Sequence, residues 1–317
     1  MYDIITVGSA TVDVFLQSDD FVIDDRGRES LVLSGGKVEV AKRVMAVGGG
    51  GTNTAAGFSR LGLNCACVAR FGNDWAGNWL KEGLAEEEFD KAYLRQINGE
   101  ETDFSTILLS STGERIILTF RGQTRVDKDI FPFKALSQTR WLYLASLEGN
   151  VALLEEVVDK AKIYKISTVL NPGNLELVHQ EELAKIFPKV KVLILNEEEA
   201  KSFWGKDYLE KIKDAGPEIV IVTCGKQGAY FYQSGKISKE PALEGKVIDA
   251  TGAGDAFSTG LVAGLIWGKS LPEAVKIGMI ESLSVIGQIG PKAGLLSKKE
   301  LEERLKKFGG AQSKSRK

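Results

Sequence analysis

The middle of the chain alternates between short apolar segments and longer segments with helical spacing. We expect strands at 141–144, 167–170, 190–195 and 218–223, with helices at 152–164 and 180–187 between them. The strands are nearly continuous apolar runs, which is typical of a parallel sheet covered on both faces. Alternation of strands with helices favours an α/β fold. The sequence therefore predicts a doubly wound, mostly parallel sheet flanked by helices.

The remaining segments extend this pattern over one large domain. We expect a first strand at 3–8 that continues toward Asp13, a helix at 52–61, a strand at 65–70, a helix at 74–85, a strand edge at 245–249 and a helix at 272–288. A chain of 317 residues can bury a substantial core. We place the domain at 1–308 and expect the Gly-, Ser- and Lys-rich tail 309–317 to be disordered.

Two β-rich insertions, at about 14–45 and 98–122, do not fit the alternation. Residues 34–37 and 110–113 have the composition of turns, so each insertion is expected to form short paired strands. Together they predict a small β-sheet that stands off the core as a lid. Exposed strand edges tend to pair with other chains, so we expect a homodimer that forms through the lid.

The composition argues against nucleic acids and membranes as partners. The formal net charge is −2, and no basic stripe carries interleaved aromatic residues. No apolar run approaches the ~20 residues that a membrane span needs. The single histidine, His179, excludes a multi-histidine metal site within this chain. Three cysteines in a large domain are typical of a reducing compartment, so we expect a cytoplasmic protein.

The run Asp249-Ala-Thr-Gly-Ala-Gly-Asp255 precedes a segment with helical spacing. A glycine loop that opens a helix presents free backbone N–H groups and the positive end of the helix dipole, which suits a phosphate. Asp255 lies at the mouth of this predicted anion site, where a carboxylate is unfavourable unless it has a function. Accepting a proton from an attacking hydroxyl is such a function. A strand-to-helix turn with a capping Asp is the structural alternative.

A second glycine cluster, Val47-Gly-Gly-Gly-Gly-Thr-Asn-Thr54, precedes the helix expected at 52–61. Its glycines let the backbone approach a ligand closely, and Asn53 offers both a donor and an acceptor. The glycine spacing does not match the dinucleotide-binding fingerprint, and the phosphate loop of common nucleotide hydrolases is absent.

With both glycine clusters, the chain resembles the ribokinase-like, or pfkB, family of carbohydrate kinases. Residues 48–53 and the strand end Arg70-Phe-Gly-Asn-Asp74 resemble the N-terminal motif of that family, and residues 249–255 resemble its C-terminal motif. The similarity runs in the same order from Asp13 to about Gly294. The resemblance implies phosphoryl transfer from ATP, with Mg²⁺, to a hydroxyl of a small sugar.

The resemblance also implies roles for the residues near the phosphates. Asp255 would be the general base. The anion hole for the transferring phosphoryl group would be formed by the amides of Gly252, Ala253 and Gly254. Asn196 and Glu199 match a motif that holds Mg²⁺ through water. The nucleotide would contact Thr223, Gly225, Gly228, Thr251, Gly252 and Gly254.

On the acceptor side, the resemblance implies a polar pocket for a polyol. Asp13 would accept hydrogen bonds from two sugar hydroxyls at once. The other substrate-binding residues would be Gly48, Gly49, Asn53, Glu148 and Asp249. An ordinary helix-start residue is an equally good interpretation of Glu148. Some relatives hold a potassium ion near Asp249, Thr251 and Gly290, and this alternative stays open.

Three features depart from the family pattern, of which one is Ala250, where Thr or Ser is common. Gly50 stands where ribokinases tend to carry lysine, and the segment 276–286 offers no asparagine for an adenine contact. The space at Gly50 keeps a nucleoside kinase open as an alternative, with the ribose in the same place and a base under the lid. A non-catalytic sugar- or nucleotide-binding protein is a third interpretation, but such a protein has no use for the base Asp255.

Overall fold

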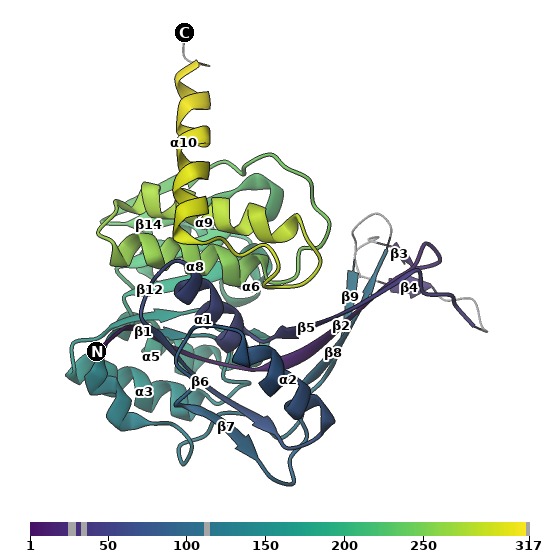
Figure 1. The fold of residues 1–317 in the computed structure, drawn as a ribbon. Coiled ribbons are helices and arrows are strands. Elements are labelled where there is room, and N and C mark those ends of the chain that lie inside the picture. The colour runs from purple at the N-terminus through teal and green to yellow at the C-terminus, as the bar shows by residue number, and fades with distance from the viewer. Residues whose placement is uncertain (25–29, 33–36, 111–114, 315–317) are drawn as a thin grey trace.

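In a computed structural model, which describes residues 1–24, 30–32, 37–110 and 115–314, the main sheet has the strand order β15-β14-β13-β12-β11-β10-β1-β6-β7 (Figure 1). Its strands are β1 (Tyr2–Val7), β6 (Cys65–Gly72), β7 (Leu94–Ile97), β10 (Thr139–Leu144), β11 (Ser167–Leu170), β12 (Val192–Asn196), β13 (Ile219–Thr223), β14 (Ala229–Gln233) and β15 (Lys236–Glu240). Neighbouring strands from β7 to β13 are parallel, and β14 and β15 add an antiparallel hairpin at one edge. The predicted doubly wound, mostly parallel sheet is confirmed.

Helices cover both faces of this sheet. They are α1 (Gly50–Arg60), α2 (Trp75–Ala85), α3 (Val151–Ile163), α4 (Asn174–Leu177), α5 (Gln180–Ile186), α6 (Glu197–Trp204), α7 (Tyr208–Lys211), α8 (Ala253–Ile266), α9 (Leu271–Ile286) and α10 (Lys298–Lys314). Successive strand residues point to opposite faces. Ile4 of β1 therefore packs in one buried cluster with α1, α8 and α9, while Ile5 packs in the other with α3 and α5.

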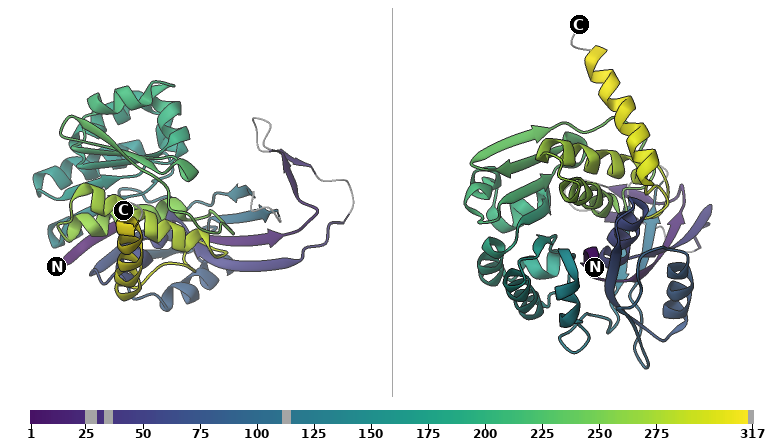
Figure 2. Two further views of the ribbon diagram at one scale, coloured as in Figure 1. Left: turned by 90° about the horizontal axis from the view of Figure 1, so that it is seen from above. Right: turned by 60° about the vertical axis from the view of Figure 1, so that its left-hand side comes forward.

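A second sheet forms the lid and extends away from the core (Figures 1 and 2). It has the order β5-β2-β8-β9 and consists of β2 (Thr11–Gln17), β5 (Lys42–Gly48), β8 (Phe104–Leu109) and β9 (Arg115–Phe120). The short strands β3 (Val22–Asp24) and β4 (Ser30–Val32) pair with each other at its outer end. The expected β-rich insertions thus form the predicted sheet. The expected turns at 34–37 and 110–113 fall mostly on residues outside the described ones.

Three expectations about local structure are wrong. The first strand ends at Val7, and Asp13 lies on β2 of the lid sheet instead of continuing β1. The segment 245–249 is not a strand, because its backbone pairs with the end of α9, where Ile248 N–H donates to the carbonyl oxygen of Ile286 at 2.7 Å. The tail is helical through Lys314, since glycine costs a propagating helix only about 1 kcal/mol per residue.

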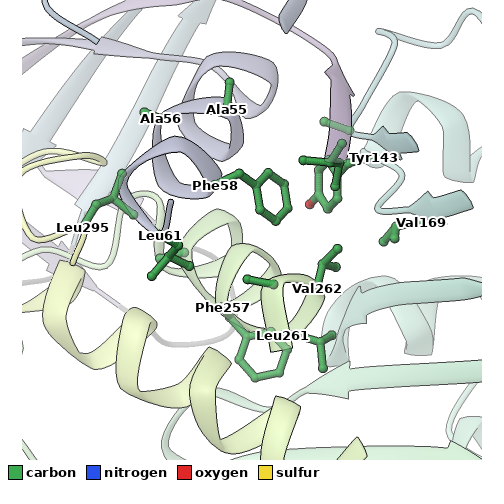
Figure 3. Packing of buried hydrophobic residues seen from close by; sticks show 14 of the residues in the cluster. Ala55, Ala56, Phe58, Leu61, Tyr143, Val169, Phe257, Leu261, Val262 and Leu295 are labelled. Carbon is green, nitrogen blue, oxygen red and sulfur yellow. The ribbon is translucent and has the colours of Figure 1, made fainter. Parts of the chain in front are cut away.

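Helices α1 and α8 are packed against each other at the centre of the molecule (Figure 3). Gly57 of α1 permits this contact, because a Cβ atom there would lie only 2.6 Å from Cγ2 of Thr259 on α8. Beside it, the ring of Phe58 meets the ring of Tyr143 edge-on, with centroids 5.9 Å apart. Each of the two helices begins at a glycine cluster, so their packing brings together two clusters that lie about 200 residues apart in sequence.

None of the helices in the described residues has the length and apolar content that crossing a membrane requires.

Candidate active site

The two glycine clusters meet at the N-terminal ends of α1 and α8. Each helix is preceded by a glycine with positive φ, Gly49 at 94° and Gly252 at 78°. A side chain at Gly252 would also collide with Pro291, whose Cβ atom would be 2.6 Å away. Across the junction, Asn53 Nδ2 donates a hydrogen bond of 2.8 Å to Asp255 Oδ2. The structure therefore brings together Asn53 and Asp255, as the sequence predicts.

The first turn of α8 presents backbone donors. Within the described part of the chain, the amides of Gly252 and Gly254 donate to no protein group. The amide of Ala253, by contrast, donates to the carbonyl oxygen of Ala250 at 3.2 Å. The sequence analysis expects the amides of Gly252, Ala253 and Gly254 to form the anion hole. The tight turn before α8 already uses the N–H group of Ala253, and the role of the three amides stays a prediction. Two free amides at the positive end of a helix still suit a phosphate.

Asp255 is a half-buried residue. Burial raises its pKa, and the hydrogen bond from Asn53 and the positive charge of Lys292 oppose that rise. The other amide atom of Asn53, Oδ1, is buried without a hydrogen-bond partner among the described residues. An unpaired buried oxygen is costly to leave unsatisfied, so this position suits a group that donates a hydrogen bond to Asn53 Oδ1.

Asp13 approaches the same junction from the lid. It is only 6 % exposed, and its Oδ1 accepts a hydrogen bond of 3.0 Å from Thr11. Burial raises its pKa to about 6, against the influence of Thr11 and Lys292. Gly48 fits against this carboxylate, since a Cβ atom there would lie 1.9 Å from Asp13 Oδ2. The structure therefore gathers Asp13, Gly48 and Asn53 on one side of Asp255.

Two adjoining cavities open along the carboxyl ends of the parallel strands, where ligands of such sheets bind. The larger, of about 560 Å³, is lined by Thr223, Gly225, Gly228, Leu243, Val247, Ala253, Gly254, Phe257, Met279, Ser282, Leu283 and Ile286, among others. The smaller, of about 240 Å³, is lined by Asn196, Glu199, Gly252, Asp255 and neighbours. They share Thr223, Ala253 and Gly254. One cleft thus joins an apolar chamber of nucleotide size to the free amides and Asp255.

Asn196 and Glu199 are placed together at the start of α6. They form a reciprocal cap: Asn196 Oδ1 accepts from Glu199 N–H, and Glu199 Oε2 accepts from Asn196 N–H, both at 2.8 Å. This cap occupies the amide oxygen of Asn196 and leaves Oε1 of Glu199, a residue that lines the smaller cavity, outside the cap. Among the described residues no group of three acidic, His or Cys side chains could hold a metal by itself. The donor set fits a cation that keeps most of its waters, as Mg²⁺ does.

Asp249 and Thr251 are placed behind the cleft. Asp249 is fully buried, and its Oδ1 accepts hydrogen bonds from the amide and the hydroxyl of Thr251 at 2.9 and 2.7 Å. Its Oδ2 accepts from the amide of Gly290 at 3.0 Å. Neither Asp249 nor Thr251 lines the two cavities. Because both carboxylate oxygens are occupied, this geometry favours a role in holding the loop before α8.

Glu148 lies on the loop that follows β10 and lines neither of the two cavities. It has a positive φ of 56°, and its side chain pairs with Arg121 at 3.4 Å. Burial and the neighbouring Asp103 carboxyl raise the pKa of Glu148 to about 8. The buried Glu176 fixes the loop by accepting hydrogen bonds from the amides of residues 147 and 149. Glu148 thus joins the core to the base of the lid.

The sequence analysis missed two basic residues of the site. Arg115, the first residue of β9, lines the smaller cavity, and its Nε atom is buried without a partner among the described residues. Lys292, in the loop after α9, is only 8 % exposed and lies near Asp13 and Asp255. The sequence signal for Arg115 was its place close after the turn that the sequence predicts at 110–113. For Lys292 it was a lone lysine in the segment Gly290-Pro-Lys-Ala-Gly294.

Comparison with known proteins gives the family. The profile of the pfkB family carbohydrate kinases matches residues 1–297. An ATP-dependent 6-phosphofructokinase of Thermoanaerobacterium thermosaccharolyticum is 26 % identical over 309 residues, covering 91 % of this chain and 89 % of that protein. A ribokinase of Haemophilus influenzae is also 26 % identical, over 270 residues that cover 82 % of this chain and 87 % of that protein. Fructokinases and nucleoside kinases are further relatives.

The structure of Arabidopsis thaliana ribokinase complexed with ribose and ATP superposes with a TM-score of 0.77 at 20 % identity, over 95 % of this chain and 98 % of that one. This likeness shows a shared ribokinase-like fold. The chain belongs to the pfkB family of carbohydrate kinases. It is a phosphotransferase with an alcohol group as acceptor, its substrates are small molecules of the sugar or nucleoside class, and membership of a kinase family implies ATP as donor.

Proposed function

We propose that this protein transfers the γ-phosphoryl group of ATP to a hydroxyl of a small sugar. The observation that supports this most is the 2.8 Å contact between Asn53 Nδ2 and Asp255 Oδ2, immediately beside the free amides of Gly252 and Gly254. Asp255 would accept the hydroxyl proton as the acceptor oxygen bonds to phosphorus and the bond to the bridging oxygen of ADP breaks. The amides would stabilise the charge on the moving phosphoryl group.

Release of ADP from ATP and Mg²⁺ with a panel of sugars tests this proposal. Asp255→Asn removes the base and should lower kcat by about 10²–10⁴-fold with the best sugar. Asp207→Asn is a matched control, since Asp207 is exposed and its side chain caps nothing. Full activity in Asp255→Asn would refute the assignment of the base, and no ADP release with any sugar would refute the substrate class.

A nucleoside as acceptor is the second candidate, and one observation favours it. A Cβ atom at Gly50 would lie 3.7 Å from Asp255 Oδ1. The glycine therefore leaves room next to the Asp255 carboxylate, which a longer side chain would fill. Thermal unfolding in the presence of adenosine, cytidine, ribose or fructose separates the two candidates. A ligand that binds only the folded protein raises its Tm, so the true acceptor class should give the larger shift.

The proposal includes Mg²⁺ bound with the nucleotide. Oε1 of Glu199 would hold it through water, and when bound it would neutralise charge on the phosphates. A potassium ion near Asp249 is part of the proposal only as a stabiliser of the loop, since the Asp249 oxygens already accept three hydrogen bonds. Activity with Mg²⁺ in sodium and in potassium buffers tests both ions.

We also propose a homodimer formed through the lid, in a reducing compartment such as the cytoplasm. The edge strand β9 leaves Ile117, Leu118 and Phe120 about half exposed, which is costly for a strand that stays in water. The three cysteines are buried and free, as a reducing compartment allows. Sedimentation of the wild type and of Leu118→Asp tests the dimer: the first should sediment as a dimer and the second as a monomer. A wild-type monomer at all concentrations would refute it.

A further inference from the structure

Lys292 is a buried cation that holds the turn between the lid and α1. Its Nζ donates to the carbonyl oxygen of Val47 at 2.7 Å and to the hydroxyl of Thr52 at 3.1 Å. Thr52 in turn donates to the carbonyl oxygen of Gly48 at 2.6 Å. The lysine therefore joins the end of β5 to the first turn of α1. Gly48 lies between these points, and its lack of a side chain leaves room for the Asp13 carboxylate. Asn53 follows Thr52 and donates a hydrogen bond to Asp255.

The backbone of Lys292 is fixed from the other side. Arg60 of α1 donates from Nη1 to the carbonyl oxygen of Lys292 at 2.9 Å, and its Nη2 pairs with Glu87 at 2.9 Å. The lysine thus cannot move away from the turn without breaking contacts that lie outside the site.

The charge of Lys292 is not used in an ion pair with any described residue. The charged or titratable groups around it are Asp13 on β2, Asp255 on α8, Glu87 after α2 and Cys67 on β6. The carboxylates of Asp13 and Asp255 also repel each other, and this repulsion contributes to the raised pKa of Asp13. Two carboxylates brought together away from water are costly when both are ionised. Lys292 is the one described cation that lowers the pKa of both.

We propose that Lys292 is a positioning residue for phosphoryl transfer, which holds the Gly48–Asn53 turn and offsets the charges of Asp13 and Asp255 so that both stay ionised. The inference rests on the proposed role of Asp255 as base. A purely structural tie is the alternative, and it predicts a different dependence on pH. Without the charge, the carboxylates would hold their protons to higher pH, and activity would return once they ionise.

The experiment compares Lys292→Gln, which can still donate to the carbonyl oxygen of Val47, with Lys292→Arg, which keeps the charge. Lys213→Gln, at an exposed position, is the control. We measure kcat/KM for the best acceptor from pH 5 to 9. In the plot of kcat/KM against pH, the acidic limb of Lys292→Gln should move up by about one pH unit. The reason is that an opposite charge nearby lowers a carboxyl pKa by about 1–3 units, and this variant has lost that charge. At pH 6 this variant should lose about tenfold and recover most of it at pH 8, whereas Lys292→Arg keeps the wild-type limb.

A loss in Lys292→Gln that is equal at every pH would overturn the inference in favour of a structural tie. Carbon-13 NMR titration of labelled aspartates, with Asp255→Asn for assignment, measures the carboxyl directly. An unchanged Asp255 pKa in Lys292→Gln overturns the inference. A raised Asp255 pKa together with full activity of Asp255→Asn would support the electrostatic inference and refute the proposed base.

Should Lys292→Gln fail to fold, the wild type still decides the question. Burial lowers the pKa of Lys292 to about 8, so its ammonium should be charged at pH 7. Carbon-13 NMR of labelled lysine, assigned with Lys292→Arg, reports that charge. A neutral amine at pH 7 would overturn the inference, because an uncharged group cannot offset the two carboxylates.

Discussion

Gly48→Ala places a single methyl group against the carboxylate that the proposed acceptor would bind. The backbone at Gly48 is not in the left-handed region, so alanine fits its conformation without strain. The new Cβ atom would lie 1.9 Å from Asp13 Oδ2 and 2.7 Å from Thr11 Oγ1. The perturbation therefore acts on the Asp13 carboxylate and on the Thr11 hydroxyl that donates to it, away from the residues that line the larger cavity.

The size of the effect follows from these distances. Ordinary contact begins at 3.4 Å, so the carboxylate must move by about 1.5 Å, and a misplacement of about 1 Å near a reacting group costs about 10²-fold in rate. We therefore expect kcat/KM for the acceptor to fall by about 10²-fold, which corresponds to about 2.7 kcal/mol. KM for ATP should stay within twofold, because Gly48 does not line the larger cavity.

Steady-state kinetics with the acceptor and ATP varied in turn measure both quantities. Gly287→Ala is the matched control: a Cβ atom there would lie 3.5 Å from its nearest neighbour, and φ is −77°. It should behave as the wild type. Thermal unfolding checks that Gly48→Ala is folded. If the folded variant keeps kcat/KM for the acceptor within threefold, the reasoning that Asp13 contacts the acceptor is wrong.

Two further variants address the lid. Arg115→Gln removes from the smaller cavity a guanidinium whose Nε atom has no hydrogen-bond partner among the described residues, and it should lower kcat by about 10²-fold with little change in KM for ATP. An unchanged kcat would exclude a contact with the phosphoryl group. Burial and Asp103 raise the pKa of Glu148 from its ordinary value of 4.5 to about 8. Between these two pH values the folded protein therefore holds a proton that the unfolded chain has lost. Because of this difference, the free energy of unfolding falls as pH rises between these values. Glu148→Gln should match the wild-type Tm at pH 5 and lack that fall up to pH 8, as thermal melts can check; an equal fall in both proteins would contradict the raised pKa.

Local signals in the sequence were sufficient where one segment determines its own structure. The periodicity of apolar residues predicts the alternation of strand and helix. The glycine clusters predict the turns before α1 and α8, because a position such as Gly252, with its positive φ and its close approach to Pro291, accepts no side chain. The hairpin of β14 and β15 went unpredicted, because its two short strands lack a clear alternation of apolar and polar residues. The prediction that the first strand continues toward Asp13 was wrong, since nothing in the sequence between Val7 and Thr11 indicates that the chain passes from one sheet to the other.

The residues missed at the site act across long sequence distances. Lys292 reaches Val47 and Thr52, about 240 residues earlier in the chain, and a lone buried lysine has no periodic signature. Arg115 enters the smaller cavity only because the lid sheet is paired in one register. A glycine-rich loop predicts a turn without saying which of its amides the turn uses, so the sequence could not show that the amide of Ala253 donates to Ala250.

The lid sheet carries groups for both partners of the proposed transfer. Asp13 lies on β2 and faces the acceptor side, while Arg115 lies on β9 and lines the smaller cavity beside Gly252 and Asp255. Strands β2, β8 and β9 are joined by continuous ladders of hydrogen bonds, so they move as one body. Any displacement of the lid that withdraws Asp13 from the acceptor must therefore also withdraw Arg115 from the phosphate side. In this arrangement a bound acceptor favours the lid position that also brings the Arg115 guanidinium to the phosphate side. When the acceptor site is empty, that position is not favoured, which discourages transfer of the phosphoryl group to water.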